Sequence, residues 1–210
     1  MVVFHLIEVN IIDTQITTWI GHDFAENIEG FEGNIVFWFS QSWIPALVYF
    51  FVIMYIAVYP FILWFAPTYF LLTNNKKSMK TLAYGLFLIY IIALPFYLFL
   101  PITNVYTFYN QTSALETVIP SVENFFYSTT TNNNCFPSLH TAMTILVAYS
   151  INLTNNKKFT YFGFFTMASV IISVIYLSIH WITDVIAGSL LALGVILLLR
   201  KIMRNQEKNE

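Results

Sequence analysis

The chain has 210 residues, of which 58% are apolar and only 10% are charged, and its mean hydropathy is +0.68. A soluble domain of this size needs more surface charge, so the composition excludes that class and indicates an integral membrane protein. The single cysteine excludes an intrachain disulfide.

Residues 1–42 form the first predicted segment. They are apolar but are interrupted by acidic residues, and Val9, Ile12, Ile16 and Trp19 recur at helical spacing. This pattern is typical of amphipathic helices that lie on a membrane rather than cross it. We therefore expect interfacial or partly membrane-embedded helices in this region.

Five apolar runs follow, and four or five of them can be drawn as membrane-spanning helices, which need about 20 residues each. In chain order the runs are Trp43–Leu72, Thr81–Pro101, Pro137–Leu153, Phe159–Ile179 and Asp184–Arg200. Pro60 and Pro67 lie within the first run and are expected to kink or end its helix, because proline cannot donate the helical hydrogen bond.

The charged residues predict how the bundle is oriented. All nine Lys and Arg residues lie between runs one and two, between runs three and four, or at the end of run five and beyond it. With five spans these positions share one side, which the positive-inside tendency assigns to the cytoplasm. We therefore predict a cell-membrane protein with a bundle at 43–201 and a cytoplasmic tail at 202–210. Residues 1–42 and the 102–136 loop are expected outside, together with nine of the eleven acidic residues.

Two polar clusters return to the same depth of the membrane. FPSLH, residues 136–140, opens the third run, and SIHWITD, residues 178–184, precedes the fifth. An antiparallel helix pair between them brings His140 and His180 to one end of the bundle. His180 and Asp184 are four residues apart, so the carboxylate can orient one imidazole nitrogen and leave the other free as a nucleophile.

The start of the third run has the features of an anion site. Pro137 suits the first turn of a helix, and the backbone N–H groups of Ser138 and Leu139 are then expected to be unpaired and able to hold phosphate oxygens. Two structural alternatives stay open, namely Ser138 as an ordinary cap and His180–Asp184 as a hydrogen bond that holds a helix end. Ionisable groups at a membrane boundary are costly and more often functional.

PSLH at 137–140 and SVIYLSIHWITD at 173–184 together resemble the type-2 phosphatidic acid phosphatase superfamily, whose second and third motifs are PSGH and SRxxxxxHxxxD. The resemblance implies a six-helix membrane bundle, so we expect five to six helices. It also implies roles for four matched residues. These are His180 as the nucleophile that forms a phosphohistidine, Asp184 as its orienter, His140 as the acid for the leaving oxygen, and Ser138 as a phosphate-binding residue together with the adjacent Leu139.

The chain departs from the family pattern at its cations. Val174 replaces the arginine of the third motif, and no KxxxxxxRP motif is visible, since Leu100 precedes Pro101. A phosphomonoester carries about −1.5 to −2 charges, and burying it without a cation is costly, which favours a diester or otherwise neutralised substrate. PSLH and the missing arginine are similar to the branch related to inositol phosphorylceramide synthase, whose members move a phospho-headgroup between lipid alcohols.

The sequence therefore predicts an integral-membrane phosphotransferase that acts on a lipid phosphate ester at the extracytoplasmic face, with headgroup transfer favoured. A lipid phosphate or diphosphate phosphatase is the alternative within the superfamily. A non-catalytic lipid-binding relative and a small transporter with a proton-relay histidine pair are alternatives of other classes. We expect a lipid phosphate and the membrane as partners, and no nucleic acid. We expect no metal or cofactor, because no HxxxH or CxxC spacing is present.

Overall fold

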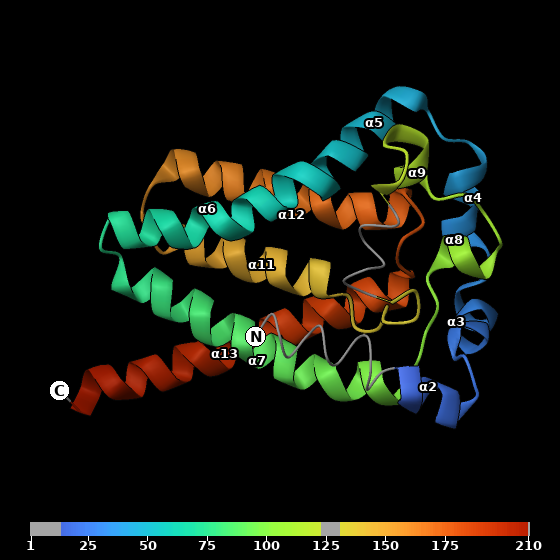
Figure 1. The fold of residues 1–210 in the computed structure, drawn as a ribbon. Coiled ribbons are helices and arrows are strands. Elements are labelled where there is room, and N and C mark those ends of the chain that lie inside the picture. The colour runs from blue at the N-terminus through green and yellow to red at the C-terminus, as the bar shows by residue number, and fades with distance from the viewer. Residues whose placement is uncertain (1–13, 123–130, 210) are drawn as a thin grey trace.

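The computed structural model describes residues 14–122 and 131–209 of the chain. These residues form helices joined by loops, and among them the one β-type contact is an isolated bridge between Ile102 and Asn134. Figure 1 shows long helices that run side by side, with short helices gathered across one end. The prediction of an all-α bundle is confirmed.

Three short helices lie ahead of the bundle, in the region where interfacial helices are expected. They are α2 (Thr14–Ile20), α3 (Ala25–Glu32) and α4 (Ile35–Gln41). Two more, α8 (Val105–Phe108) and α9 (Ala114–Val118), lie at the same end of the molecule (Figure 1). The predicted helical positions Val9 and Ile12 lie outside the described residues. The location of these helices at a membrane surface stays a prediction.

The first long helix changes its hydrogen bonding in the middle. It comprises α5 (Pro45–Ile53), a π-helical segment η2 (Met54–Val58) and α6 (Tyr59–Leu72). Pro60 lies just after the π segment and has no N–H to continue the α-helical ladder, which accounts for the change. Neither Pro60 nor Pro67 ends the helix.

Four helices in the described part of the chain are long and apolar enough to cross a membrane. They cover Pro45–Leu72, Lys76–Phe99 (α7), Lys157–Tyr176 (α12) and Ile182–Asn205, the last within α13 (Ile182–Asn209). Large apolar side chains point away from the bundle on these helices, such as Trp64 at 77% and Leu190 at 64% exposure. Exposed apolar surface on long helices suits lipid rather than water, so the chain is an integral membrane protein.

The third predicted run does not form a spanning helix. It contains α11 (Leu139–Asn152), which has 14 residues and is shorter than a bilayer crossing requires. This helix packs against α6, α7, α12 and α13, and its buried residues include the polar Thr144 and Ser150. Gly85 of α7 allows close packing there, because a Cβ at that position would collide with the side chain of Leu146. The predicted span is thus the central helix of the bundle.

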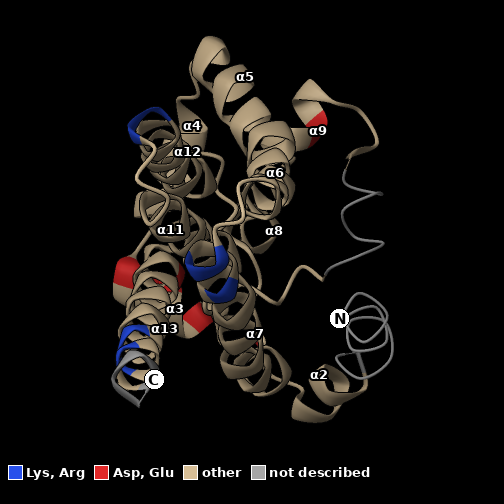
Figure 2. Cartoon of the chain, turned by 90° about the vertical axis from the view of Figure 1, so that its left-hand side faces the viewer, with Lys and Arg blue, Asp and Glu red and all other residues tan. Residues whose placement is uncertain are grey.

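The two ends of the bundle differ in charge. The α6–α7 turn, the α11–α12 turn and the last turns of α13 lie at one end, here called the basic end, which Figure 2 shows from outside. It carries all the Lys and Arg side chains that the structure describes, namely Lys76, Lys77, Lys80, Lys157, Lys158, Arg200, Lys201 and Arg204. The opposite end, here called the histidine end, contains His140, His180 and the short helices.

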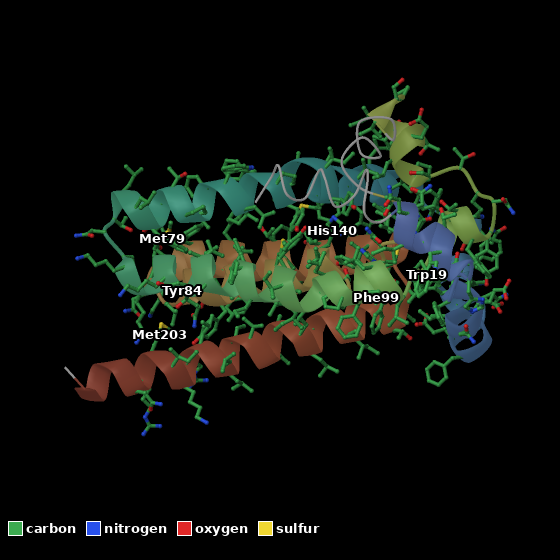
Figure 3. All side chains as sticks on the ribbon, turned by 60° about the horizontal axis from the view of Figure 1, so that its bottom comes forward. Trp19, Met79, Tyr84, Phe99, His140 and Met203 are labelled. Carbon is green, nitrogen blue, oxygen red and sulfur yellow. The ribbon has the colours of Figure 1, made fainter. Side chains whose placement is uncertain are left out.

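Figure 3 shows where single side chains lie along this axis. His140 lies inside the bundle, toward the end that carries Trp19 and Phe99, whereas Met79 and Met203 lie toward the basic end (Figure 3). The polar cluster is therefore inside one end of the bundle rather than on its lipid-facing surface.

Candidate active site

The starts of α11 and α13 are docked against each other at the histidine end. The backbone N–H of Ser138 donates to the carbonyl of Asp184 at 3.0 Å. Gly188 makes this approach possible, because a Cβ at that position would overlap the carbonyl oxygen of Ser138. The two segments that carry the sequence motifs are thus joined by backbone contacts.

Three of the residues predicted for the site form one hydrogen-bonded line. His140 Nδ1 lies 3.3 Å from His180 Nε2, and His180 Nδ1 lies 3.2 Å from Asp184 Oδ2. His180 is 4% exposed and Asp184 is fully buried. With Asp184 ionised, this network assigns the proton of His180 to Nδ1, and Nε2 then accepts from His140. The lone pair of His180 therefore points toward His140.

The turn before α13 holds His180 rigidly. The N–H groups of Ile179 and His180 both donate to the carbonyl of Val174, at 2.9 and 3.0 Å. The next residue, Trp181, is 1% exposed, and its indole N–H donates to the carbonyl of Thr103 at 2.9 Å. Packing and hydrogen bonds on both sides therefore fix the histidine before any substrate arrives.

Ser138 occupies the cap of α11, as one of the two open interpretations has it. Its hydroxyl oxygen accepts from the N–H of Thr141 at 3.3 Å, and the side chain is fully buried. The expectation that the N–H of Ser138 is unpaired is wrong, because α13 supplies an acceptor. Pro137 lies before the cap rather than in the first helical turn, and its carbonyl accepts from Tyr97 Oη at 2.7 Å.

The first turn of α11 nevertheless keeps donors that the fold does not use. Within the described residues, the backbone N–H groups of Leu139 and His140 have no acceptor. The first N–H groups of a helix have no partner within the helix itself, and together with its dipole they attract anions. The N–H of Leu139 is thus unpaired, while its role in holding phosphate stays a prediction, and the N–H of His140 is a second unpaired donor beside the histidine pair.

Two tyrosines from the π-helical segment and its end surround His140, and the sequence analysis missed both. The ring centroids of Tyr55 and Tyr59 lie 4.8 and 5.2 Å from that of His140. Tyrosines within an apolar run are interpreted as packing or lipid-facing material, and these two are buried in the bundle. Pro60 was the available signal, since a proline inside a helix often marks a distortion near a functional site.

Glu32 is the third residue that the sequence analysis missed, and it comes from the end of α3. Its Oε2 accepts from the N–H of Ile182 at 2.9 Å, and its Oε1 accepts from the N–H of Thr183. Asp184 Oδ2 takes the preceding N–H, that of Trp181, at 2.9 Å. Two carboxylates therefore cap α13. No local pattern predicts a contact between residues 150 positions apart.

Cys135 adds a thiol to the cluster. One ligand atom from each of Cys135, His180 and Asp184 lies within 4.8 Å of the other two, and all three residues are buried, so together they could hold a metal ion. Burial, followed by the charges of Asp184 and Asp23, raises the pKa of the Cys135 thiol well above its usual value. The thiol is therefore protonated at neutral pH, which weakens it as a ligand.

The arrangement contains the parts that nucleophilic phosphoryl transfer needs. These are an oriented imidazole whose Nε2 lone pair accepts, among the described residues, only from His140, the second imidazole of His140 itself, and two unpaired N–H groups at a helix start. A fixed cation is not among these parts, because all described Lys and Arg side chains lie at the basic end.

Comparison with known proteins adds one finding. A family model described as the PAP2 superfamily matches residues 31–198, which is most of the chain and includes both histidines and Glu32. No curated protein and no solved structure matches the chain. The match agrees with the two sequence motifs at the level of the superfamily.

Proposed function

The chain belongs to the PAP2 superfamily, and from that premise we propose that it transfers a phospho-headgroup between lipids through a phosphohistidine. Membership of the superfamily supports a lipid phosphatase or phosphotransferase. The observation that carries the finer proposal is the hydrogen-bonded line from His140 through His180 to Asp184. A non-catalytic lipid-binding protein has no need for a nucleophile, an orienter and an acid in that order.

In the first step the phosphate of the donor lipid enters between the two histidines and parts their hydrogen bond. The N–H groups of Leu139 and His140 hold its oxygens, and the Ser138 hydroxyl, which only accepts in the cap, donates a further hydrogen bond. His180 Nε2 attacks phosphorus and forms the N–P bond, while the P–O bond to the lipid alcohol breaks. His140 takes up a proton as the anionic phosphate binds beside it, and gives that proton to the departing oxygen.

In the second step the hydroxyl of an acceptor lipid attacks the phosphohistidine. His140, now neutral, takes the proton of that hydroxyl, the new P–O bond forms, and the electron pair of the N–P bond returns to His180. Asp184 stabilises the positive charge that the His180 ring carries in the intermediate and holds Nδ1–H throughout. Water in place of the lipid alcohol would give hydrolysis by the same steps.

The charge of the site favours a diester over a monoester. A phosphodiester carries about one negative charge, whereas a phosphomonoester approaches two. With no described cation at the histidine end, the second charge has only N–H dipoles to stabilise it. This argument, together with PSLH and Val174, supports the branch similar to inositol phosphorylceramide synthase. The positive-inside tendency supports an extracytoplasmic site.

The test is to trap the intermediate in the purified protein reconstituted in vesicles. A phosphodiester lipid labelled with radioactive phosphorus is added, and the reaction is quenched in alkali, in which phosphohistidine survives. Label is expected on the wild type and on His22→Ala, a control at an exposed histidine. His180→Ala is expected to take no label and to lose about 10⁴-fold or more in turnover. His140→Ala is expected to lose about 10²- to 10⁴-fold.

Retained turnover or retained label in His180→Ala would overturn the mechanism. Adding a lipid alcohol such as a diacylglycerol separates the two reactions of the superfamily. Label that moves to the added lipid supports headgroup transfer, whereas label that appears only in the water-soluble phosphate supports the phosphatase.

A further inference from the structure

We propose that Glu32 is a specificity-determining residue, whose carboxylate closes the N-terminus of α13 to substrate and makes the neighbouring site prefer singly charged phosphate esters to doubly charged ones. The inference rests on the proposed function, because it concerns the phosphate that His180 attacks. Glu32 acts through the field at the site and through the position of α13, and it forms no bond to the reacting atoms.

Three successive N–H groups at the start of α13 are already bonded to carboxylates, and the next one, that of Asp184, has no acceptor among the described residues. The N–H of Trp181 donates to Asp184, and the N–H groups of Ile182 and Thr183 donate to Glu32. A helix N-terminus is otherwise a ready phosphate site. Glu32 therefore occupies the position that an anionic substrate could take, and the first turn of α11 is left as the place for phosphate oxygens.

The carboxylate also keeps the histidine end negative. Glu32 is bonded to the same helix start that bears Asp184, and Asp184 contacts His180. Among the described residues, the positive partner of Glu32 is the α13 dipole, which is worth about half a charge, because all Lys and Arg side chains lie at the far end. A negative field opposes a substrate in proportion to its charge. One added unit of charge at about 10 Å in a dielectric of roughly 25 changes affinity about ten-fold.

A matched control lies on the same helix. The Glu29 carboxylate accepts a hydrogen bond from Tyr109 Oη at 3.2 Å, so it is also partly buried and bonded, but its partner is a side chain rather than the start of α13. Replacing Glu29 removes the same charge from the same helix. A comparison of the two positions therefore separates the role of Glu32 from a general effect of acidic residues in α3.

The decisive substitution is Glu32→Gln, which keeps the shape of the side chain and one oxygen acceptor but removes the charge. Binding of inorganic phosphate at pH 8, mostly a dianion, and of diethyl phosphate, a monoanion, is measured by calorimetry on the full chain in detergent. Glu32→Gln is expected to tighten inorganic phosphate about a hundred-fold and diethyl phosphate about ten-fold. Glu29→Gln is expected to change the ratio of the two affinities less than Glu32→Gln does, because the Glu29 carboxylate is not bonded to the start of α13. Glu32→Asp, which retains the charge, is expected to keep the wild-type ratio of the two affinities.

A second variant covers the case in which Glu32→Gln does not fold. Asn34→Lys adds a cation at an exposed position two residues from Glu32 and leaves both cap contacts in place. It is expected to shift the affinity ratio in the same direction, by about two- to three-fold, because an exposed charge is partly screened.

An unchanged ratio in Glu32→Gln, an equal change in Glu29→Gln, or no anion binding to the wild type would overturn the inference. These measurements need no turnover, so they are independent of the trapping experiment. A shifted ratio without phosphohistidine would leave the role of Glu32 in anion preference and refute the proposed transfer. Phosphohistidine with an unchanged ratio of affinities would support the proposed transfer and refute the role of Glu32.

Discussion

The starts of α11 and α13 lie side by side at the histidine end, yet they differ in how many of their backbone N–H groups have an acceptor. At α13 two carboxylates, Glu32 and Asp184, take the N–H groups of three successive residues. At α11 a hydroxyl takes only the N–H of Thr141, and the N–H groups of Leu139 and His140 have no acceptor among the described residues. The difference shows that neighbouring helix starts can be completed independently: the start of α13 is bonded to carboxylates beside His180, whereas the start of α11 keeps the donors that the proposed function assigns to phosphate.

The largest effect is expected from a substitution at the start of α13, where the N–H groups are bonded to carboxylates. Asp184→Asn removes the charge that orients His180 Nδ1–H and leaves one oxygen for two donors. Turnover is expected to fall about 10³- to 10⁴-fold, as when asparagine replaces the aspartate of a catalytic His–Asp pair. The measurement is kcat on a lipid phosphodiester in vesicles.

Glu26→Gln is the matching control, because this exposed carboxylate in α3 has no part in the cap. It is expected to keep wild-type turnover. A loss of less than ten-fold in Asp184→Asn would mean that the pair only holds a helix end, which is the structural alternative that the sequence left open.

The contact between the two helix starts can be loosened by Gly188→Ala. The added Cβ overlaps the carbonyl of Ser138, so α11 must move away from α13 and the Ser138–Asp184 hydrogen bond must lengthen. We expect the free energy of unfolding to fall by about 1–3 kcal/mol and turnover to fall about 10- to 100-fold, because the two histidines are misaligned. Thermal unfolding in detergent and kcat provide the two readouts.

Gly194→Ala in the same helix is the control, since a Cβ there meets nothing within 4 Å. Alanine in a helix interior is favoured over glycine by about 0.5–1 kcal/mol. Equal melting temperatures for the two variants would contradict the close approach at Gly188.

The smallest effect is expected at the open helix start itself. Ser138→Ala removes the cap of α11, which costs about 1 kcal/mol of stability. It also removes the proposed hydroxyl donor to phosphate, so KM is expected to rise about ten-fold, as for the loss of one hydrogen bond to a charged group.

Asn75→Ala provides the comparison at the basic end, where the Asn75 side chain caps α7 by accepting from the N–H of Ser78 at 3.0 Å. Both variants are expected to lose similar stability. An unchanged KM in Ser138→Ala would leave Ser138 as a cap alone.

The sequence predicted the features that depend on local periodicity and length. Four of the five apolar runs correspond to the long helices, and the helix pair between the motifs brings His140 and His180 within hydrogen-bond distance. The i, i+4 spacing of His180 and Asp184 also predicted their contact, because the turn between them is short.

The errors and omissions arise from contacts between distant segments. The N–H of Ser138 was predicted to be unpaired, but it donates to Asp184 because Gly188 allows α13 to approach α11. The contact of Glu32 with the start of α13 joins residues that are 150 positions apart in the sequence. The third run was predicted to span the membrane but forms a short central helix. Hydropathy alone does not distinguish a helix buried among other helices from one that faces lipid. Tyr55 and Tyr59 reached His140 through a change in helix geometry that hydropathy does not reveal.

The short central helix also sets the depth of the chemistry. Fourteen residues of α-helix extend about 21 Å, roughly 9 Å less than the hydrocarbon layer. If Asn152 lies at the basic boundary of that layer, Leu139 and the two histidines lie below the opposite boundary. A phosphate would then have to leave the headgroup plane to meet the proposed nucleophile. A lipid that slides down within the bilayer meets this condition more easily than a soluble ester arriving from water.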